Sequence, residues 1–319
     1  MAVEPSIYVN GAFVPQSEAR ISVLDHAVLY GDGVFETATA RGGRIFKLDE
    51  HLDRGFRSMA AIALEPPCSR DSMRALIIEA VRRNGLKDAY IKWIVTRGSN
   101  GRPLMDPTGC TPNLIILVQP YFDRVSAERR SEGLRLKTVA IRRPPGQVLD
   151  PQIKSINYLN LVLAKLEAKA AGADEALLLD LNGRLCEATG CNVFVLRDKR
   201  LLTPRHDILA GITRQTVLDL APEQGLAVEE ADLELYDAYT ADEIILSSTA
   251  GGLLPVVAID GRRISGGRPG PAFQALDKAY RELLASDRYG TPVPFQSGST
   301  EDEPQDFRLT TSRELEKLP

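Results

Sequence analysis

The sequence predicts an α/β protein built from two lobes. The chain has 319 residues, which is more than one ordinary domain needs. Hairpin patterns and helical patterns are mixed, without the strict strand–helix–strand alternation of a doubly wound sheet. A polar stretch separates two parts that are richer in apolar residues. We therefore expect a small N-terminal domain at 1–121, a linker at 122–133 and a larger C-terminal domain at 134–292.

The elements of the first domain follow from turn residues and apolar spacing. An Asn-Gly pair favours a two-residue hairpin turn, so Asn10-Gly11 splits SIYVNGAFV into two strands. Ser69 or Asp71 can cap a helix that ends at Asn84-Gly85. The expected elements, in order, are hairpins turning at Asn10-Gly11 and Gly42-Gly43, helices at 48–64 and 69–85, and strands at 89–98 and 113–121.

The second domain is expected to begin with a strand at 134–143 and a helix within 150–172, which Gly172 ends. Five apolar residues of this helix share one face: Leu159, Val162, Leu163, Leu166 and Ala170. The later elements, in order, are a hairpin turning at Asn182-Gly183, a helix within 208–225, a strand, loop and Asp-Gly hairpin at 242–264, and a helix at 270–286. Residues 293–319 are polar, which predicts a disordered tail.

Composition and charge argue against several classes of function. The net charge is −4, with 44% hydrophobic and 26% charged residues, so nothing indicates nucleic acid or an anionic membrane as partner. No apolar stretch approaches the roughly 20 residues that span a bilayer, and the N-terminus lacks a signal-peptide pattern. The four cysteines and three histidines show no metal-ligand spacing. We expect reduced thiols, no metal and a cytoplasmic location.

Two residues could carry covalent and acid–base chemistry. Lys154 precedes the helix within 150–172, and Glu187 stands among apolar or small residues of a strand. A solvated loop is the ordinary place for a lysine, and an edge strand facing water would equally accommodate the glutamate. The alternative is a lysine whose pKa is lowered by its neighbours and a buried carboxylate, which requires a cationic or protonated partner.

Two loops offer free backbone amides. Gly211, Ile212 and Thr213 stand where a helix begins, and a helix N-terminus binds anions. Ser248 and Thr249 follow a strand and offer hydroxyl groups as well. Either loop alone is a weak signal. Together with a lysine for a carbonyl and a carboxylate for a protonated ring nitrogen, they match the aldehyde, pyridinium and phosphate of pyridoxal phosphate (PLP).

Six ordered motifs then resemble the fold type IV PLP enzymes, also called class IV aminotransferases. They are LYGDGVFET, HLDRGFRSM, DPQIKSINYLNLVLAKLEA, LCEATGCNVF, LAGITRQTV and SSTAGGLLPV, within residues 6 to about 292. The resemblance implies a small α/β domain, a larger domain of mixed sheet or barrel and helices, and a homodimer in which loops of one subunit reach the other's pocket.

The resemblance also implies a role for each cofactor residue. Lys154 matches the lysine that binds the PLP aldehyde and shuttles the proton, and Glu187 matches the carboxylate on the pyridine nitrogen. The residues that match the phosphate and ring contacts of the family are Arg54, Tyr158, Gly211, Ile212, Thr213, Ser248 and Thr249.

The positions that set substrate choice resemble several branches of the family. Thr37 stands where branched-chain enzymes have glycine, and Lys92 stands where they have arginine. Thr37, Lys92 and the loop TRGSNGR resemble aminodeoxychorismate lyases. The C-terminal region SSTAGGLLPVVAIDGRRISGGRPGP, which includes Ala250, resembles (R)-selective amine transaminases. The segment GDGVFE is close to D-amino acid enzymes. We expect Lys92 and Arg102 to hold a substrate carboxylate, with Tyr30, Phe35 and Tyr90 as pocket walls.

The predicted activity is a ping-pong transamination between an amino acid or primary amine and a 2-keto acid, similar to branched-chain aminotransferases. A PLP-dependent lyase is the first alternative. A binding or regulatory protein that kept the fold without catalysis is the second, and the presence of both Lys154 and Glu187 argues against it. The sequence leaves open which donor and acceptor are used and with which stereochemistry.

Overall fold

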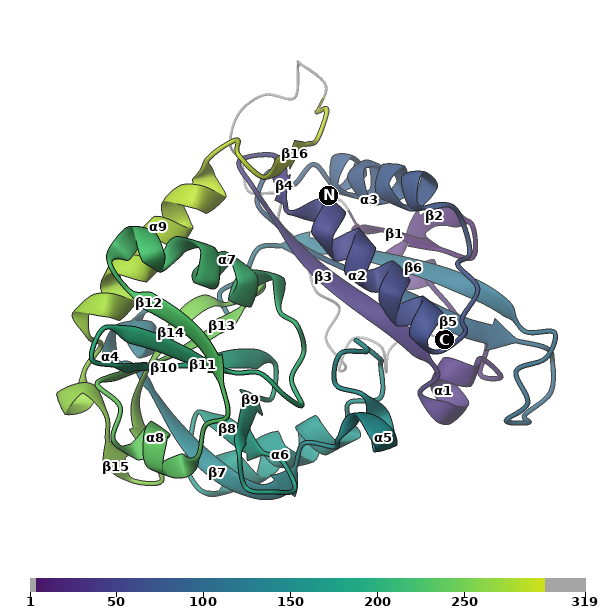
Figure 1. Cartoon of the computed structure of the whole chain (residues 1–319). Helices are drawn as coiled ribbons and strands as arrows, with labels where there is room; N and C mark the ends of the chain where they lie inside the picture. The colour runs from purple at the N-terminus through teal and green to yellow at the C-terminus, as the bar shows by residue number, and fades with distance from the viewer. Residues whose placement is uncertain (1–3, 296–319) are drawn as a thin grey trace.

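The computed structural model describes residues 4–295, and these form two lobes, each built on its own sheet (Figure 1). The predicted α/β class with a mixed sheet or barrel is confirmed. Residues 296–319, most of the predicted tail, lie outside the described residues.

The first lobe holds a seven-stranded antiparallel sheet in the order β16-β4-β3-β5-β6-β1-β2. Its strands are β1 (Ser6–Val9), β2 (Ala12–Pro15), β3 (Gly33–Arg41), β4 (Arg44–Phe46), β5 (Ala89–Ser99), β6 (Thr111–Pro120) and β16 (Gly290–Pro292). The predicted turn between β1 and β2 is confirmed, because Asn10 and Gly11 take positive φ values of 53° and 83°. Gly42 and Gly43 likewise take 54° and 77° between β3 and β4.

Two helices cover one face of this sheet (Figure 1). They are α2 (Leu48–Ala61) and α3 (Arg70–Asn84), as predicted, and a short α1 (His26–Tyr30) precedes β3. Ser69 caps α3 by accepting a hydrogen bond from the Ser72 amide, and Gly85 ends the helix in the left-handed conformation. The core between sheet and helices includes Trp93, Leu52 and Ile77, all almost fully buried.

The last strand departs from the predicted domain division. We expected 134–292 to belong to the second lobe, but β16 pairs antiparallel with β4 of the first sheet. Val293, which we assigned to the tail, is 7% exposed and packs into the first lobe's core. The stretch was too short and too polar to show this pairing in the sequence, since β16 has three residues.

The second lobe is built on a mixed sheet in which six strands close a ring. The order is β12-β11-β10-β13-β14-β7-β8-β9, and a further pairing of β9 with β10 completes the ring. The strands are β7 (Leu134–Arg142), β8 (Glu175–Leu179), β9 (Leu185–Ala188), β10 (Cys191–Arg197), β11 (Arg200–Pro204), β12 (Ala227–Ala231), β13 (Glu243–Ser248), β14 (Gly252–Ile259) and β15 (Arg262–Arg263). Because β9 has a neighbour on each side, no residue on it lies at an open edge.

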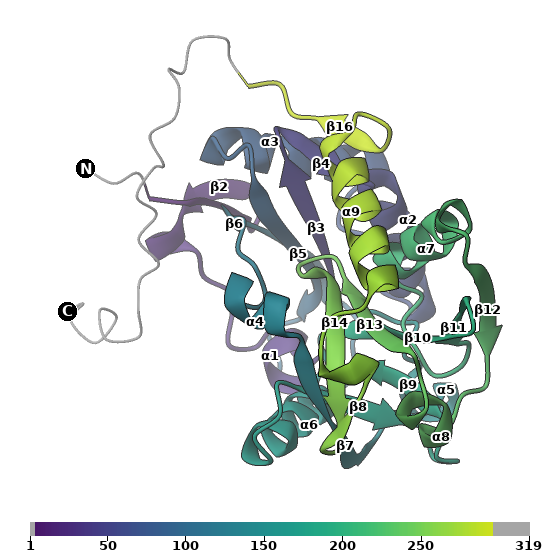
Figure 2. The ribbon, with the colours of Figure 1, turned by 90° about the vertical axis from the view of Figure 1, so that its left-hand side faces the viewer.

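Helices surround this barrel-like sheet, and α9 runs along its outside (Figure 2). They are α4 (Ala127–Glu132), α5 (Gly146–Leu149), α6 (Leu159–Ala170), α7 (Ile212–Leu220), α8 (Leu235–Tyr239) and α9 (Pro271–Ala285), with 3-10 turns at Gln16–Glu18, Pro222–Gln224 and Ser265–Gly267. The predicted linker thus contains a short helix, α4, which Ser126 caps by accepting from the Arg129 amide.

Helix α6 buries one face against the sheet, but its largest apolar side chains lie on the opposite face. Leu161, Ala164 and Ala168 are buried and pack with residues of β7 and β8. The other face carries four large apolar side chains that remain exposed: Leu159 (66%), Val162 (54%), Leu163 (46%) and Leu166 (57%). Two alanines let the helix approach the sheet closely, and the larger residues are left facing outward.

Candidate active site

A cavity lies between the two lobes. It holds about 860 Å³ of space, counting open solvent at its mouth. Its walls come from both sheets, from the segment before α6 and from the loops that follow β9, β11 and β13. The lining residues are Phe35, Thr37, Arg54, Tyr90, Arg124, Lys154, Tyr158, Leu161, Glu187, Gly190, Cys191, Asn192, Leu209, Gly211, Ile212, Thr213, Ser247, Ser248, Thr249 and Ala250.

Lys154 is fixed by hydrogen bonds to the first lobe. Its carbonyl oxygen accepts from the Phe35 amide at 2.9 Å, and the Ile156 amide donates to the Gly33 carbonyl at 3.0 Å. The Lys154 amide donates to the Ser58 hydroxyl at 3.2 Å. The segment therefore continues the pairing of β3 and lies five residues ahead of Leu159, where α6 begins. A cation directly at a helix N-terminus is unfavourable, because that end carries a partial positive charge. Lys154 avoids this cost because it lies ahead of the helix.

The surroundings of Lys154 favour a neutral amine. Burial lowers the pKa of Lys154 to about 8, and the positive charge of Arg54 acts in the same direction. The Nζ atom lies 4.3 Å from the centroid of the Phe35 ring. At pH 7 a pKa of about 8 leaves roughly one molecule in ten with a neutral amine, far more than an ordinary lysine would have. A side chain of this kind can attack a carbonyl and can accept a proton.

Glu187 is buried in the cavity wall, with 5% of its surface exposed. Its Oε1 lies 2.7 Å from Nη2 of Arg143. Its Oε2 accepts from Nδ2 of Asn192 at 3.2 Å and from the Leu209 amide at 3.1 Å. Burial raises the pKa of Glu187, and Arg143 opposes that shift. The alternative of an edge-strand glutamate facing water is excluded by this geometry.

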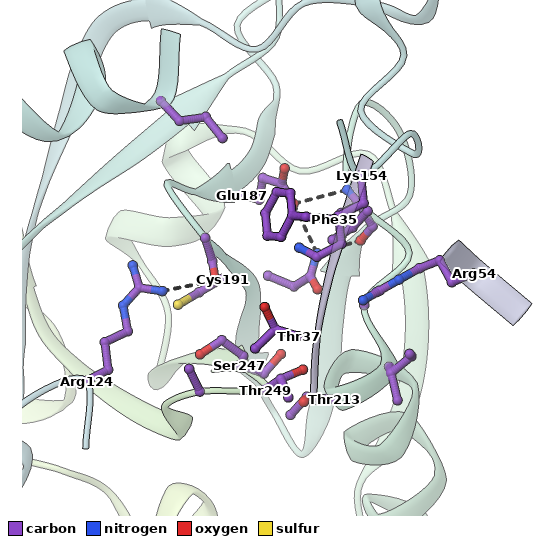
Figure 3. A pocket seen from close by; sticks show the side chains of 18 of the residues that line it. Phe35, Thr37, Arg54, Arg124, Lys154, Glu187, Cys191, Thr213, Ser247 and Thr249 are labelled. Carbon is purple, nitrogen blue, oxygen red and sulfur yellow. Dashed lines mark hydrogen bonds between the residues drawn. The ribbon is translucent and has the colours of Figure 1, made fainter. Parts of the chain in front are cut away.

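The start of α7 forms one end of the cavity. Gly211 is the N-cap residue, and the amides of Ile212 and Thr213 begin the helix. A Cβ atom at Gly211 would lie only 2.0 Å from Oδ1 of Asn192, so this position has no room for a side chain. Figure 3 places Thr213 near Thr249 and Ser247. The Ser247 hydroxyl is buried and has no hydrogen-bond partner among the described residues.

Arg54 projects from α2 into the cavity wall (Figure 3). Its Nε and Nη2 donate to Glu36 at 2.6 and 2.9 Å, and its Nη1 donates to the Ala210 carbonyl at 3.0 Å. His51 Nδ1 lies 2.9 Å from the same Glu36 carboxylate. Burial alone would raise the pKa of Glu36, but Arg54 and His51 hold it well below its usual range. A guanidinium has five N–H groups, so two remain for an anion.

Tyr158 stands beside Phe35, with the two rings edge to face at 5.2 Å between centroids. Burial raises the pKa of Tyr158 to about 12, and the charge of Glu187 adds to the shift. The hydroxyl therefore stays protonated near neutral pH and can donate a hydrogen bond.

The cavity brings together most of the sequence-predicted residues, and three lie elsewhere. Lys92 is not among the lining residues, but it pairs with Thr37, its Nζ lies 4.6 Å from the Phe35 ring centroid, and burial lowers its pKa. Tyr30 is on α1 and is 37% exposed. Arg102 is exposed in the loop between β5 and β6. Neither Tyr30 nor Arg102 lines the cavity within one chain, because α1 and this loop lie away from its walls.

Sequence reasoning missed several residues of the cavity. Arg124 lines it and is held by Glu175 at 2.7 Å and by the Gly190 carbonyl at 3.1 Å. Asn192 and Cys191 come from β10, and burial raises the pKa of the Cys191 thiol. Their partners are distant in the chain, so spacing alone could not reveal them. The motif LCEATGCNVF contains both, and the structure pairs Asn192 with Glu187 across β9 and β10.

These residues fit PLP. The chemistry of the donors matches its parts: an amine of lowered pKa at Lys154, a buried carboxylate at Glu187, and amides with Arg54 for a phosphate. The unpartnered Ser247 hydroxyl is a further sign of a ligand that completes the site. Within residues 4–295, no group of three or more acidic, histidine or cysteine side chains is placed to hold a metal ion. No helix in the same range could cross a bilayer.

Comparisons with known proteins agree with this geometry. Residues 33–259 match the family Amino-transferase class IV. The chain is 42% identical over 279 residues to a "Putative branched-chain-amino-acid aminotransferase" of Methanocaldococcus jannaschii, covering 87% of this chain and 96% of that protein. A crystal structure of the T.th. branched-chain amino acid aminotransferase with pyridoxamine 5'-phosphate superposes with a TM-score of 0.87 at 34% identity, covering 92% of this chain and 100% of that one.

The same T.th. enzyme complexed with N-(5'-phosphopyridoxyl)-L-glutamate superposes with a TM-score of 0.86 at 34% identity and the same coverage, 92% and 100%. The fold, the arrangement of the cavity and these matches lead to one family. The chain belongs to the class IV aminotransferases and is a PLP-dependent transaminase similar to the branched-chain enzymes.

Proposed function

We propose that this protein transfers the amino group of an apolar L-amino acid to a 2-keto acid by a ping-pong mechanism. The observation that carries the proposal is the convergence on one cavity of Lys154, Glu187 and the α7 N-terminus. Bound PLP would supply an aldehyde and an electron-withdrawing ring. The residues named here would bind that ring, orient it and hold or transfer protons beside it.

Each residue has a proposed task that follows from its surroundings. With PLP bound, Lys154 Nζ would hold the aldehyde carbon, and the amine released by the donor would accept the proton of the donor Cα and return it. Glu187 would keep the nitrogen of the bound ring protonated. Tyr158 would donate a hydrogen bond from its hydroxyl group to the ring oxygen. The phosphate would be held by Arg54, by the amides of Ile212 and Thr213 and by Ser248 and Thr249.

The side chain of the substrate would contact an apolar wall with cations nearby. Phe35, Tyr90 and Leu161 supply rings and methyl groups, and Thr37 narrows the wall. Lys92 and Arg124 supply positive charge for a carboxylate. This combination suits both an apolar amino acid and a 2-keto acid. A relative is known in complex with a phosphopyridoxyl derivative of L-glutamate, which supports a dicarboxylate as the second substrate.

Two finer assignments compete with this proposal. The first is selectivity for D-amino acids or (R)-amines. It would follow if the bulk of Thr37 and the SSTAGG loop, which includes Ala250, made the two substituents of the substrate exchange sides in the pocket. A lyase of the aminodeoxychorismate type would follow from Thr37 and Lys92. The lyase would release pyruvate from aminodeoxychorismate with no keto acid present.

Half-reactions of the PLP-loaded enzyme test the proposal. L-leucine, D-alanine and (R)-1-phenylethylamine are each mixed with the enzyme, and loss of the visible cofactor band is followed. We expect fast loss with L-leucine and slow loss with the other two. Lys154→Ala should abolish exchange while the protein stays folded. Absence of any cofactor band in the wild-type protein would instead favour a non-catalytic role.

We further propose that the protein is a homodimer. The exposed apolar face of α6 carries Leu159, Val162, Leu163 and Leu166, and α1 exposes Val28 (55%) and Leu29 (36%). Such a concentration of apolar surface marks an interaction site. A second copy of this chain is the proposed occupant. Tyr30 lies on α1 beside this surface, and we propose that Tyr30 and Arg102 act in the partner's cavity.

A further inference from the structure

Arg143 stands behind Glu187, outside the cavity lining. It follows the last residue of β7, its amide donates to the Leu179 carbonyl at 2.8 Å, and its side chain is buried. The ion pair that it makes is with Glu187. Its Nε is also buried and has no hydrogen-bond partner among the described residues. Burying a cation is costly unless an opposite charge compensates it, and here that charge is the carboxylate of Glu187.

The acceptor positions of Glu187 define what Arg143 can do. A carboxylate offers about four lone-pair directions, two on each oxygen. Asn192 and the Leu209 amide both donate to Oε2, and Nη2 of Arg143 forms an ion pair with Oε1 at 2.7 Å. The one acceptor position that remains is therefore on Oε1, the oxygen that Arg143 binds. Any ring nitrogen that meets Glu187 shares that oxygen with Arg143.

We propose that Arg143 is a positioning residue that holds Glu187 as a carboxylate with the free lone pair of Oε1 available to the cofactor ring. This inference rests on the role proposed for Glu187. Arg143 is not among the residues that line the cavity, so it acts through Glu187. Burial works against the charge of Glu187, and Arg143 is the closest positive charge that opposes it. Without Arg143 the carboxyl group takes up a proton and loses its preference for a protonated ring nitrogen.

Binding of two cofactor forms to the apoprotein tests this without measuring activity. One form is PLP, and the other is its 1-deaza analogue, in which a C–H group replaces the ring nitrogen. The wild-type protein is expected to bind PLP about 10- to 100-fold more tightly than the analogue. In Arg143→Met this preference should fall to near unity, whereas affinity for the analogue should change little. Arg143→Lys, which keeps the charge, should retain most of the preference.

Controls separate positioning from a merely structural role. Arg143→Gln is a second neutral variant, in case Arg143→Met does not fold, and should lose the preference equally. Arg97→Met breaks another arginine–carboxylate pair, with Asp32 at 2.9 Å, and should leave the preference intact. Equal weakening of both ligands in the neutral Arg143 variants would overturn the inference and leave the proposed function standing. Equal binding of both ligands by the wild-type protein would overturn the role of Glu187 together with the inference.

Discussion

Nε of Arg54 lies 2.6 Å from Oε1 of Glu36, and both side chains are buried. The pair joins α2 to β3, since Arg54 is on the helix and Glu36 on the strand that also carries the cavity residues Phe35 and Thr37. His51, on α2, contacts the same carboxylate. Glu36 therefore fixes the direction in which the two free N–H groups of Arg54 point.

Glu36→Gln should weaken both the fold and the phosphate site. Removal of one charge from a buried pair leaves Arg54 uncompensated, so we expect the free energy of unfolding to fall by about 3 kcal/mol. Affinity for PLP should fall by about tenfold or more. Urea unfolding and PLP titration measure the two effects. Glu79→Gln is the control, because Glu79 pairs with Arg82 on the outer face of α3, and should change stability by less than about 1 kcal/mol.

Gly211→Ala should damage the cavity without changing any charge. The new Cβ atom would meet Oδ1 of Asn192 at 2.0 Å, so Asn192 would move away from Glu187 and Leu209. We expect a loss of about 1–3 kcal/mol in stability from overpacking, together with weaker binding of PLP. Gly146→Ala is matched, since its closest contact would be 3.4 Å. Unchanged PLP affinity in Gly211→Ala would remove this contact from the site.

The rate at which the apoprotein combines with PLP should rise with pH through about 8. The attacking form of Lys154 is the neutral amine, and the pKa of Lys154 is lowered to about 8 by burial and by Arg54. Below that pH most of the amine is protonated. The rate should then fall about tenfold for each pH unit, as it does when one ionising group controls the rate. Stopped-flow absorbance between pH 6 and about 10 measures the profile. A midpoint near the value of an exposed lysine would contradict this environment.

Lys92→Met should raise KM for the acceptor keto acid by about tenfold, with a smaller effect on kcat, because a charged hydrogen bond to its carboxylate is lost. Steady-state kinetics with 2-oxoglutarate as acceptor measure the change. Lys137→Met is the control, since Lys137 pairs with Asp260 in the second lobe, whereas Lys92 lies against the lining residue Phe35. An unchanged KM in Lys92→Met would exclude Lys92 from carboxylate binding.

Leu163→Glu should separate the proposed dimer. The substitution places a carboxylate at the centre of the exposed face of α6, and burying it against a second copy would be unfavourable. Sedimentation or light scattering should show the mass of a dimer for the wild-type protein and of a monomer for the variant. Leu181→Glu, at a 68% exposed leucine in the turn between β8 and β9, should remain dimeric. A monomeric wild-type protein would end the proposal.

The sequence revealed those features whose signal is local. Each hairpin turn that we predicted was marked by adjacent Asn-Gly, Gly-Gly or Asp-Gly residues, and the structure confirms all four with positive φ values at their glycines. The caps of α3 were equally local. Lys154 and Glu187 stood out because a cation or a carboxylate is unusual in an apolar segment. The cytoplasmic location stays a prediction.

Features that depend on contacts between residues far apart in the chain could not be predicted from the sequence. Arg143 and Glu187 are 44 positions apart, and Glu36 and Arg54 lie on different elements, so no spacing rule connects them. Apolar periodicity in α6 identified the helix but not its buried side, because small residues pack against the sheet more closely than leucines do. The pairing of β16 with β4 joins residues almost 250 positions apart.

That last pairing limits how the two lobes can move. The chain leaves the first sheet after β6 and comes back at β16, so two covalent crossings join the lobes. A single crossing would act as a swivel, whereas two confine any hinge motion to the axis that passes through both. The hydrogen bonds between Lys154 and β3 add a third tether. Any motion of the lobes that opens the cavity to a cofactor is therefore restricted to rotation about that axis.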